Sequence, residues 1–125
     1  MDFPKELRYS TDHEWVSIKD DIATIGITEF AQSELGDIVF LELPDSGQAF
    51  KTGEVFGNVE AVKTVSDLFM PLSGQVIQIN PSLASEPELL NEDPYGEGWI
   101  MQIKGFSVSE FEALLSADQY QSQVG

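Results

Sequence analysis

Hydrophobic and polar positions alternate along the chain in short runs, which predicts strands rather than long helices. Residues 14–18 and 22–27 are rich in Ile, Val and Trp, and the polar turn Lys19-Asp20-Asp21 between them predicts a hairpin. Extended runs recur at 37–43, 55–62, 65–72, 75–79 and 99–103, most of them bordered by Gly or Pro. This spacing of short strands is typical of a β-sandwich or a small barrel and not of alternating βαβ units.

Two short helical segments are expected between these strands. Thr28 can cap a helix that runs to Leu35, with Gly36 available as its left-handed stop. The polar stretch over 82–98 is rich in Pro and Gly, which predicts loops with one helical turn near 87–90.

The strongest helical pattern lies near the C-terminus. Ser109 and Glu112 have the spacing of a capping box, and Phe111, Leu114 and Leu115 fall on one helix face. We therefore expect a helix over about 109–120 that covers one end of the sheets. The elements together predict a mainly β fold with short helices and a C-terminal helix.

Length and charge restrict the possible functions. A chain of 125 residues, 42% of them hydrophobic, is typical of one globular domain, which we expect to span residues 1–125. Its 22 acidic and 6 basic residues give a net charge of −16, which argues against binding to nucleic acids or to anionic membranes. Partners with basic surfaces would be favoured.

The side chains needed for independent catalysis are scarce. His13 is the only histidine, there is no cysteine, and no Gly-x-Ser-x-Gly motif is present. No spacing of His, Asp or Glu fits a zinc or calcium site, and no phosphate-binding glycine loop occurs. These absences favour a protein that binds or carries something over an enzyme.

Lys63 lies between two β-prone runs of nearly equal length, 55–62 and 64–71. Antiparallel pairing of these runs would place Lys63 at the tip of a hairpin. One interpretation is an ordinary exposed turn lysine. The other is the attachment point of a carrier arm, whose root has to be exposed and rigid while the arm moves.

Six distinctive blocks follow one another along nearly the whole chain. They are His13-Glu14-Trp15-Val16, Ala23-Thr24-Ile25-Gly26-Ile27-Thr28, Leu35-Gly36-Asp37-Ile38-Val39-Phe40-Leu41-Glu42-Leu43-Pro44, Glu60-Ala61-Val62-Lys63-Thr64-Val65-Ser66-Asp67, Pro71-Leu72-Ser73-Gly74 and Asn91-Glu92-Asp93-Pro94-Tyr95-Gly96-Glu97-Gly98-Trp99. Each block alone is weak, but the ordered set is highly specific and resembles the glycine cleavage H-protein family. The resemblance implies the barrel-sandwich hybrid fold of lipoyl and biotinyl domains.

The resemblance also implies a cofactor, lipoate attached covalently to Lys63, and a role as non-catalytic shuttle of the glycine cleavage system. An aminomethyl group would pass from a pyridoxal-phosphate glycine decarboxylase to a tetrahydrofolate-dependent aminomethyltransferase. A flavin-containing dihydrolipoyl dehydrogenase would reoxidise the dithiol, and a lipoate ligase or a lipoyl/octanoyl transferase would supply the group. We expect a monomer in a bacterial cytoplasm, with a mature organelle matrix as the alternative, because residues 1–6 resemble neither a signal nor a transit peptide.

Candidate residues for a cleft that holds the loaded arm also follow from the resemblance. They are Glu14 and Asp67, with Asp12 as a third carboxylate where some relatives have Ser. Glu34 replaces a histidine of some relatives, so an imidazole role at that position cannot be transferred. Each acid could instead be ordinary solvated charge.

Several alternative functions remain open at this point. A biotin carrier would share the fold, but Lys63 lacks an Ala-Met-Lys-Met setting. A lipoyl domain of a 2-oxo-acid dehydrogenase would not need the region after Trp99. A lipoyl or octanoyl relay donor to other enzymes has no distinguishing sequence feature, and turnover by the unmodified chain would indicate a free-standing enzyme.

Overall fold

The computed structural model describes all residues 1–125 and contains two antiparallel sheets. Six strands form the larger sheet in the order β1-β2-β3-β9-β8-β5, and three form the smaller sheet in the order β4-β6-β7. The strands are β1 Arg8–Tyr9, β2 Glu14–Lys19, β3 Ile22–Ile27, β4 Ile38–Glu42, β5 Ala49–Phe50, β6 Val55–Ala61, β7 Val65–Phe69, β8 Gly74–Ile79 and β9 Met101–Lys104.

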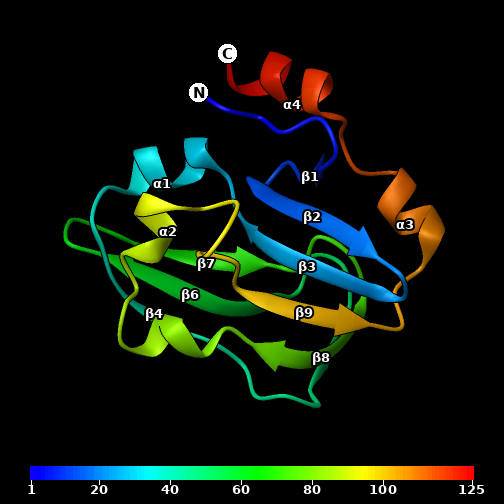
Figure 1. The fold of residues 1–125 in the computed structure, drawn as a ribbon, viewed down its shortest axis with the longest axis horizontal. Coiled ribbons are helices and arrows are strands. Elements are labelled where there is room, and N and C mark those ends of the chain that lie inside the picture. Colours follow the sequence, from blue (N-terminus) through cyan, green and yellow to red (C-terminus); the bar gives the residue numbers. More distant parts are fainter.

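Short helices surround the sheets. They are α1 Glu29–Leu35, the 3₁₀ turn η1 Pro81–Ala84, α2 Leu89–Glu92, α3 Val108–Glu112 and α4 Ala117–Val124. Figure 1 shows α1 and α2 together at one end of the sheets and α4 beside the N-terminal segment. This architecture confirms the expected mainly β barrel-sandwich hybrid with short helices.

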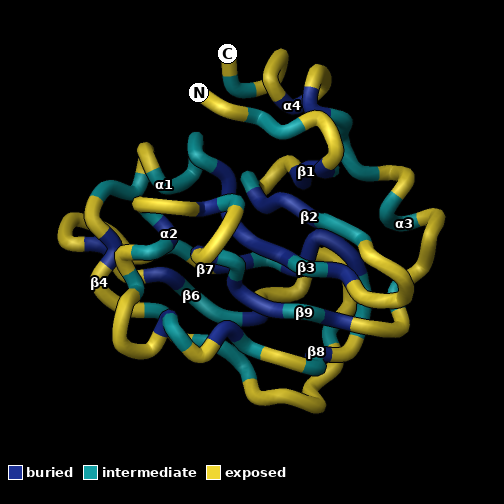
Figure 2. The backbone as a smooth tube through the Cα atoms, in the orientation of Figure 1, coloured by how far each residue is buried: buried dark blue, intermediate teal, exposed yellow.

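The core fills the space between the two sheets. Sixteen buried residues form its main cluster, including Ile25 and Ile103 of the larger sheet and Val59 and Leu68 of the smaller one. Figure 2 shows these buried segments in the interior, with most of the exposed residues in turns, helices and termini at the periphery. A second cluster holds α4 against the first strands, where the rings of Tyr9 and Tyr120 stack with centroids 4.8 Å apart.

The local predictions for the first part of the chain agree with the structure. β2 and β3 form a hairpin whose register pairs Glu14 with Ile27 and Lys19 with Ile22. Thr28 caps α1 because its side-chain oxygen accepts a hydrogen bond from the backbone N–H of Ala31. The expected helical turn near 87–90 begins slightly later, at α2.

The single helix expected over about 109–120 is wrong in its boundaries, because the structure contains α3 and α4 in its place. Leu115 pairs with Tyr9 as an isolated β-bridge, with both backbone hydrogen bonds formed at 2.8 and 2.9 Å. A residue that donates and accepts across a bridge cannot continue a helix. The capping box is formed by Ser116 and Gln119 at the start of α4 and not by Ser109 and Glu112.

Candidate functional site

Lys63 lies in the three-residue turn that connects β6 to β7. The backbone N–H of Ala61 donates to the carbonyl of Thr64 at 2.8 Å and closes the turn. The N–H of Val62 donates to the carbonyl of Asp37 at 3.0 Å, which ties the turn to the segment before β4. Lys63 is exposed, and Figure 2 shows this turn at the left margin of the molecule.

The end of α1 supports the side chain of Lys63. Gly36 terminates the helix with a φ of 80°, a conformation that favours glycine. A Cβ at this position would lie 3.3 Å from Cε of Lys63 and 3.8 Å from its Nζ. The lysine stem therefore lies across the glycine, and a larger residue here would displace it.

Asn91 of α2 fixes the backbone under this lysine. Its side chain accepts a hydrogen bond from the N–H of Ile38 at 3.0 Å and donates to the carbonyl of Gly36 at 2.8 Å. A third bond, from Asn91 Nδ2 to Oε1 of Gln32, reaches back into α1. One polar side chain thus connects α2, the end of α1 and the start of β4. No sequence pattern indicated this role, since the partners of Asn91 are more than 50 residues away.

A cavity of about 410 Å³, here named the α1 cleft, opens between α1 and the β6–β7 hairpin. Its walls combine apolar side chains with carboxylates and one imidazole. They are Asp12, His13, Ile27, Phe30, Ala31, Glu34, Leu35, Val59, Ser66, Asp67 and Leu68. Leu35 precedes Gly36, so the cleft begins next to the stem of Lys63.

The structure brings Asp12 and Asp67 together in the walls of the α1 cleft, although they are 55 positions apart. Glu34 joins them from α1. Glu14 does not line the cleft and is only 1% exposed. The cleft therefore carries three carboxylates at its surface and a fourth acidic group buried close to them.

Glu14 is bound on both carboxylate oxygens. Ser10 Oγ donates to Oε1 at 2.9 Å, and the backbone N–H of Phe69 in β7 donates to Oε2 at 3.0 Å. Burial disfavours the charged form more than these two donors favour it, so the pKa of Glu14 is raised to about 8. Because Ser10 Oγ also accepts from the N–H of Asp12 at 3.3 Å, Glu14 is connected to both walls of the cleft.

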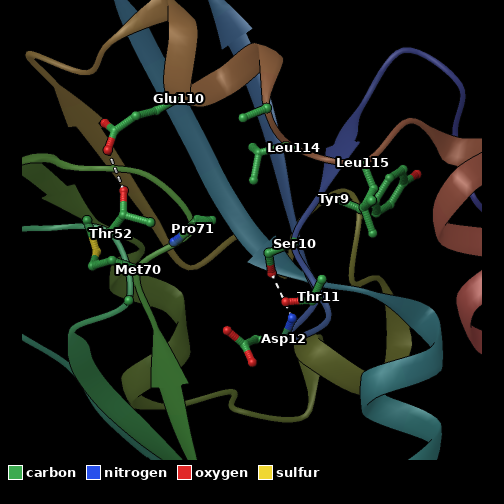
Figure 3. Close-up of a pocket in the computed structure, with 12 residues that line it drawn as sticks. Tyr9, Ser10, Thr11, Asp12, Thr52, Met70, Pro71, Glu110, Leu114 and Leu115 are labelled. Carbon is green, nitrogen blue, oxygen red and sulfur yellow. Dashed lines mark hydrogen bonds between the residues drawn. The ribbon is translucent and has the colours of Figure 1, made fainter.

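A second cavity, of about 300 Å³, lies on the other side of Asp12, between α3 and the residues around Thr52 and Pro71 (Figure 3). Glu110 of α3 closes one end of it by accepting hydrogen bonds from Thr52 Oγ1 at 2.6 Å and from Ser73. The bond from Thr52 is the main reason that the pKa of Glu110 is lowered. Glu110 thus connects α3 to Thr52 and Ser73 across this cavity.

Two negative observations complete the description of the chain. No helix is long and apolar enough to cross a membrane. No group of three or more His, Cys, Asp or Glu side chains is arranged to hold a metal ion.

Comparison with known proteins assigns the family. The family model described as "Glycine cleavage H-protein" matches residues 7–125. A glycine cleavage system H protein of Staphylococcus epidermidis is 50% identical over 125 residues, covering 100% of this chain and 99% of the relative. Its counterpart in Bacteroides thetaiotaomicron is 48% identical over 124 residues, covering 99% and 98%.

A solved structure agrees with this assignment. The crystal structure of a glycine cleavage system H protein from Mycobacterium marinum superposes with a TM-score of 0.88 at 38% identity, covering 96% of this chain and 97% of the other. Similarity over the full length, in sequence and in fold, excludes a match to a shared module alone. The chain belongs to the glycine cleavage H-protein family, the non-catalytic lipoyl carriers of the glycine cleavage system.

Proposed function

We propose that Lys63 carries the lipoyl group and that the chain shuttles an aminomethyl unit and a dithiol between the enzymes of the glycine cleavage system. The observation that carries this proposal is the position of Lys63. The residue is exposed in a turn held by two backbone hydrogen bonds, and it adjoins the α1 cleft. The other lysines lack this combination. They are Lys5, Lys19, Lys51 and Lys104.

The chemistry of the α1 cleft fits a lipoyl arm. Its apolar wall, with Ile27, Phe30 and Leu35, suits a hydrocarbon chain and sulfur, and its volume of about 410 Å³ is ample for a group of that size. When bound, the lipoyl group supplies a disulfide that opens to accept an aminomethyl unit. The residues of this chain position that unit and limit its contact with water.

The carboxylates of the cleft would hold the amine of the unit in its protonated form. Asp12, Glu34 and Asp67 line the cleft, and a nearby negative charge raises the pKa of an amine. An amine without a free lone pair cannot expel the sulfur to which its carbon is attached, so protonation preserves the load. Glu14, buried behind Asp12, would strengthen this effect once the bound cation favours its ionised form.

The outer face of the smaller sheet is suited to protein partners. Phe40, Glu60 and Val65 lie opposite one another in a row across its three strands, and all three are exposed. Val39 and Val62, also exposed, extend this apolar surface toward the turn of Lys63. Exposed apolar residues that gather around one lysine are typical of a contact surface. The net charge of −16 would favour an enzyme with basic residues around its active-site entrance.

The partners we propose are the decarboxylase, the aminomethyltransferase and the dihydrolipoyl dehydrogenase, together with a lipoate ligase or a lipoyl/octanoyl transferase. An enzyme that acylates Nζ has to contact the hairpin itself, whereas the other three act at the far end of the arm. The three relatives described above are bacterial. We therefore propose that a monomer works in a bacterial cytoplasm.

The decisive experiment is intact mass spectrometry before and after treatment with a lipoate ligase, lipoate and ATP. The wild type should gain one lipoyl mass, assigned to Lys63 by peptide mapping, and Lys63→Arg should gain none. Lys51→Arg is the matched control, because Lys51 is also an exposed lysine in a loop. Lipoylation of the Lys63→Arg protein would refute the assignment. Glycine decarboxylation measured beside acyl transfer separates the shuttle from a relay donor.

The role of the cleft carboxylates has its own test. Asp67→Asn and Glu14→Gln should leave lipoylation unchanged but shorten the lifetime of the loaded form, which is followed as formaldehyde released without the transferase. Asp45→Asn serves as a control, because Asp45 is exposed and does not line the α1 cleft. Equal release from wild type and both variants would show that these acids do not protect the load.

A further inference from the structure

His13, the only histidine of the chain, has an unusual backbone. Its φ is 69°, one of two positive values among the non-glycine residues. The other belongs to Asp20 in the β2–β3 turn. His13 ends the β1–β2 turn, where its N–H donates to the carbonyl of Ser10 at 3.2 Å, and the N–H of Thr28 donates to the carbonyl of His13 at 3.1 Å. These bonds fix the backbone of His13 in the wall of the α1 cleft.

The imidazole of His13 is connected to the C-terminal helix. Its Nδ1 is 2.9 Å from the hydroxyl of Tyr120 in α4, and that hydroxyl is 2.8 Å from Oγ1 of Thr28. Thr28 Oγ1 also accepts the N–H of Ala31 as the cap of α1. Tyr120 and Thr28 are completely buried, so neither hydroxyl can use solvent as a partner.

Counting protons along this chain of three groups leaves one satisfied arrangement. The phenol of Tyr120 keeps its proton at neutral pH, since burial raises its pKa to about 12. If Thr28 donates to Tyr120 and Tyr120 donates to Nδ1 of His13, every hydroxyl proton has an acceptor. If Nδ1 carries a proton and donates it to the hydroxyl of Tyr120, the hydroxyl proton of either Thr28 or Tyr120 is left without an acceptor. A buried unpaired donor is costly.

The same count disfavours a charged imidazole, because an imidazolium also carries a proton on Nδ1. Burial lowers the pKa of His13, while Asp12 and Glu34 oppose this shift. Asp67 and Tyr120 are the other titratable groups beside it. His13 is therefore neutral, with its proton on Nε2. Nε2 of His13 has no hydrogen-bond partner in the protein. Every buried polar side-chain atom of the chain does have such a partner, so Nε2 is not buried and is accessible.

We propose that His13 is a binding residue for the arm on Lys63: Thr28 and Tyr120 fix its tautomer, and Nε2–H donates a hydrogen bond in the α1 cleft to an acceptor atom of the arm. A protonated amine offers only donors, so it cannot be the partner of this N–H and belongs to the carboxylates. The acceptors of a lipoyl arm are its amide oxygen and its sulfur atoms. The C-terminal helix thereby takes part in holding the arm, and the inference rests on the function proposed for Lys63.

A long-range ¹H–¹⁵N spectrum tests the tautomer directly, because His13 is the only imidazole of the chain and its signals need no further assignment. In the unmodified protein at pH 7, we expect Nδ1 unprotonated and Nε2 protonated. In the lipoylated protein, before or after loading with glycine and the decarboxylase, the Nε2–H resonance should move. It should stay in place in Lys63→Arg protein treated in the same way. An Nδ1–H tautomer, an imidazolium, or a resonance that moves in neither state would overturn the proposal.

Two variants test the consequence for the arm. Tyr120→Phe keeps the ring but frees Nδ1, and His13→Asn tolerates the positive φ but lacks Nε2. Both should shorten the lifetime of the loaded form about 2- to 10-fold, the range for one hydrogen bond. Tyr9→Phe is the matched control, because Tyr9 stacks on Tyr120 and its hydroxyl bonds only to Pro4. Equal effects of Tyr9→Phe and Tyr120→Phe on this lifetime would show that Tyr120 contributes through packing alone, which would refute the inference.

Failure of this inference can be distinguished from failure of the proposed function. A Lys63 that gains no lipoyl mass would refute the function. A lipoylated and loaded protein whose His13 resonance does not move would refute only the role of His13.

Discussion

Replacing Glu14 with Gln is expected to change how the stability of the fold depends on pH. The pKa of Glu14 is about 8 in the folded protein against an ordinary value of 4.5, because burial outweighs its two hydrogen bonds. Below pH 4.5 both the folded and the unfolded chain bind this proton, and its stabilising contribution is complete. As the pH rises toward 8, the unfolded chain loses the proton first, so the contribution is lost progressively.

The size of the effect follows from that shift. Each unit of pKa difference corresponds to about 1.36 kcal/mol. Between pH 5 and pH 8 the free energy of unfolding of the wild type should fall by roughly 3–4 kcal/mol relative to Glu14→Gln. A change of this size is a large fraction of the roughly 5–15 kcal/mol that stabilises a typical domain. Gln has nearly the same shape and can still accept the N–H of Phe69.

Urea unfolding at four pH values between 5 and 8 measures this difference. Glu86→Gln is the control, because Glu86 is exposed and its side chain makes no hydrogen bond, and its difference from wild type should not vary with pH in this range. If the difference in free energy of unfolding between wild type and Glu14→Gln is also constant over this pH range, the raised pKa of Glu14 is refuted. A difference of opposite sign would show that Ser10 and Phe69 outweigh the cost of burial and keep the carboxylate ionised.

Two further predictions concern the surroundings of Lys63. Asn91→Ala removes three hydrogen bonds and should lower the free energy of unfolding by about 2–3 kcal/mol, with faster hydrogen exchange in the β6–β7 turn. Asn58→Ala, which removes one exposed bond, should cost less than about 1 kcal/mol, and equal costs would contradict the role of Asn91. Phe40→Ser should slow acylation of Lys63 several-fold in a kinetic mass assay. Val108→Ser is the control, with 63% exposure against 56% for Phe40, and equal slowing would exclude a specific contact.

The features that sequence could predict are those decided by neighbouring residues. The β2–β3 hairpin and the cap of α1 by Thr28 depend on side chains within a few positions, so their patterns are complete in one segment. The C-terminal region was predicted as one helix instead of two, because the interruption at Leu115 comes from a bridge to Tyr9 at the other end of the chain. Local propensity carries no information about such a partner.

The candidate site divides in the same way. Two matched β-prone runs predicted Lys63 at a hairpin tip, whereas its role and the candidate acids Asp12, Glu14 and Asp67 came only through family resemblance. No sequence pattern indicated that His13 would face the same cleft as Asp67, or that Tyr120 would bond to its ring, because these contacts join segments far apart in the chain. Long-range polar contacts of this kind need the folded arrangement of the sheets.

The turn of Lys63 combines an ordered base with an exposed tip, and this combination explains how one carrier can serve several enzymes. The bonds from Val62 to Asp37 and from Asn91 to Gly36 order the backbone before any partner arrives. An enzyme that docks on the hairpin therefore does not have to supply the free energy for ordering it. In the function proposed above, the remaining freedom lies in the lysine side chain and its arm. The α1 cleft would then compete with each active site for the end of the arm without any change in the fold.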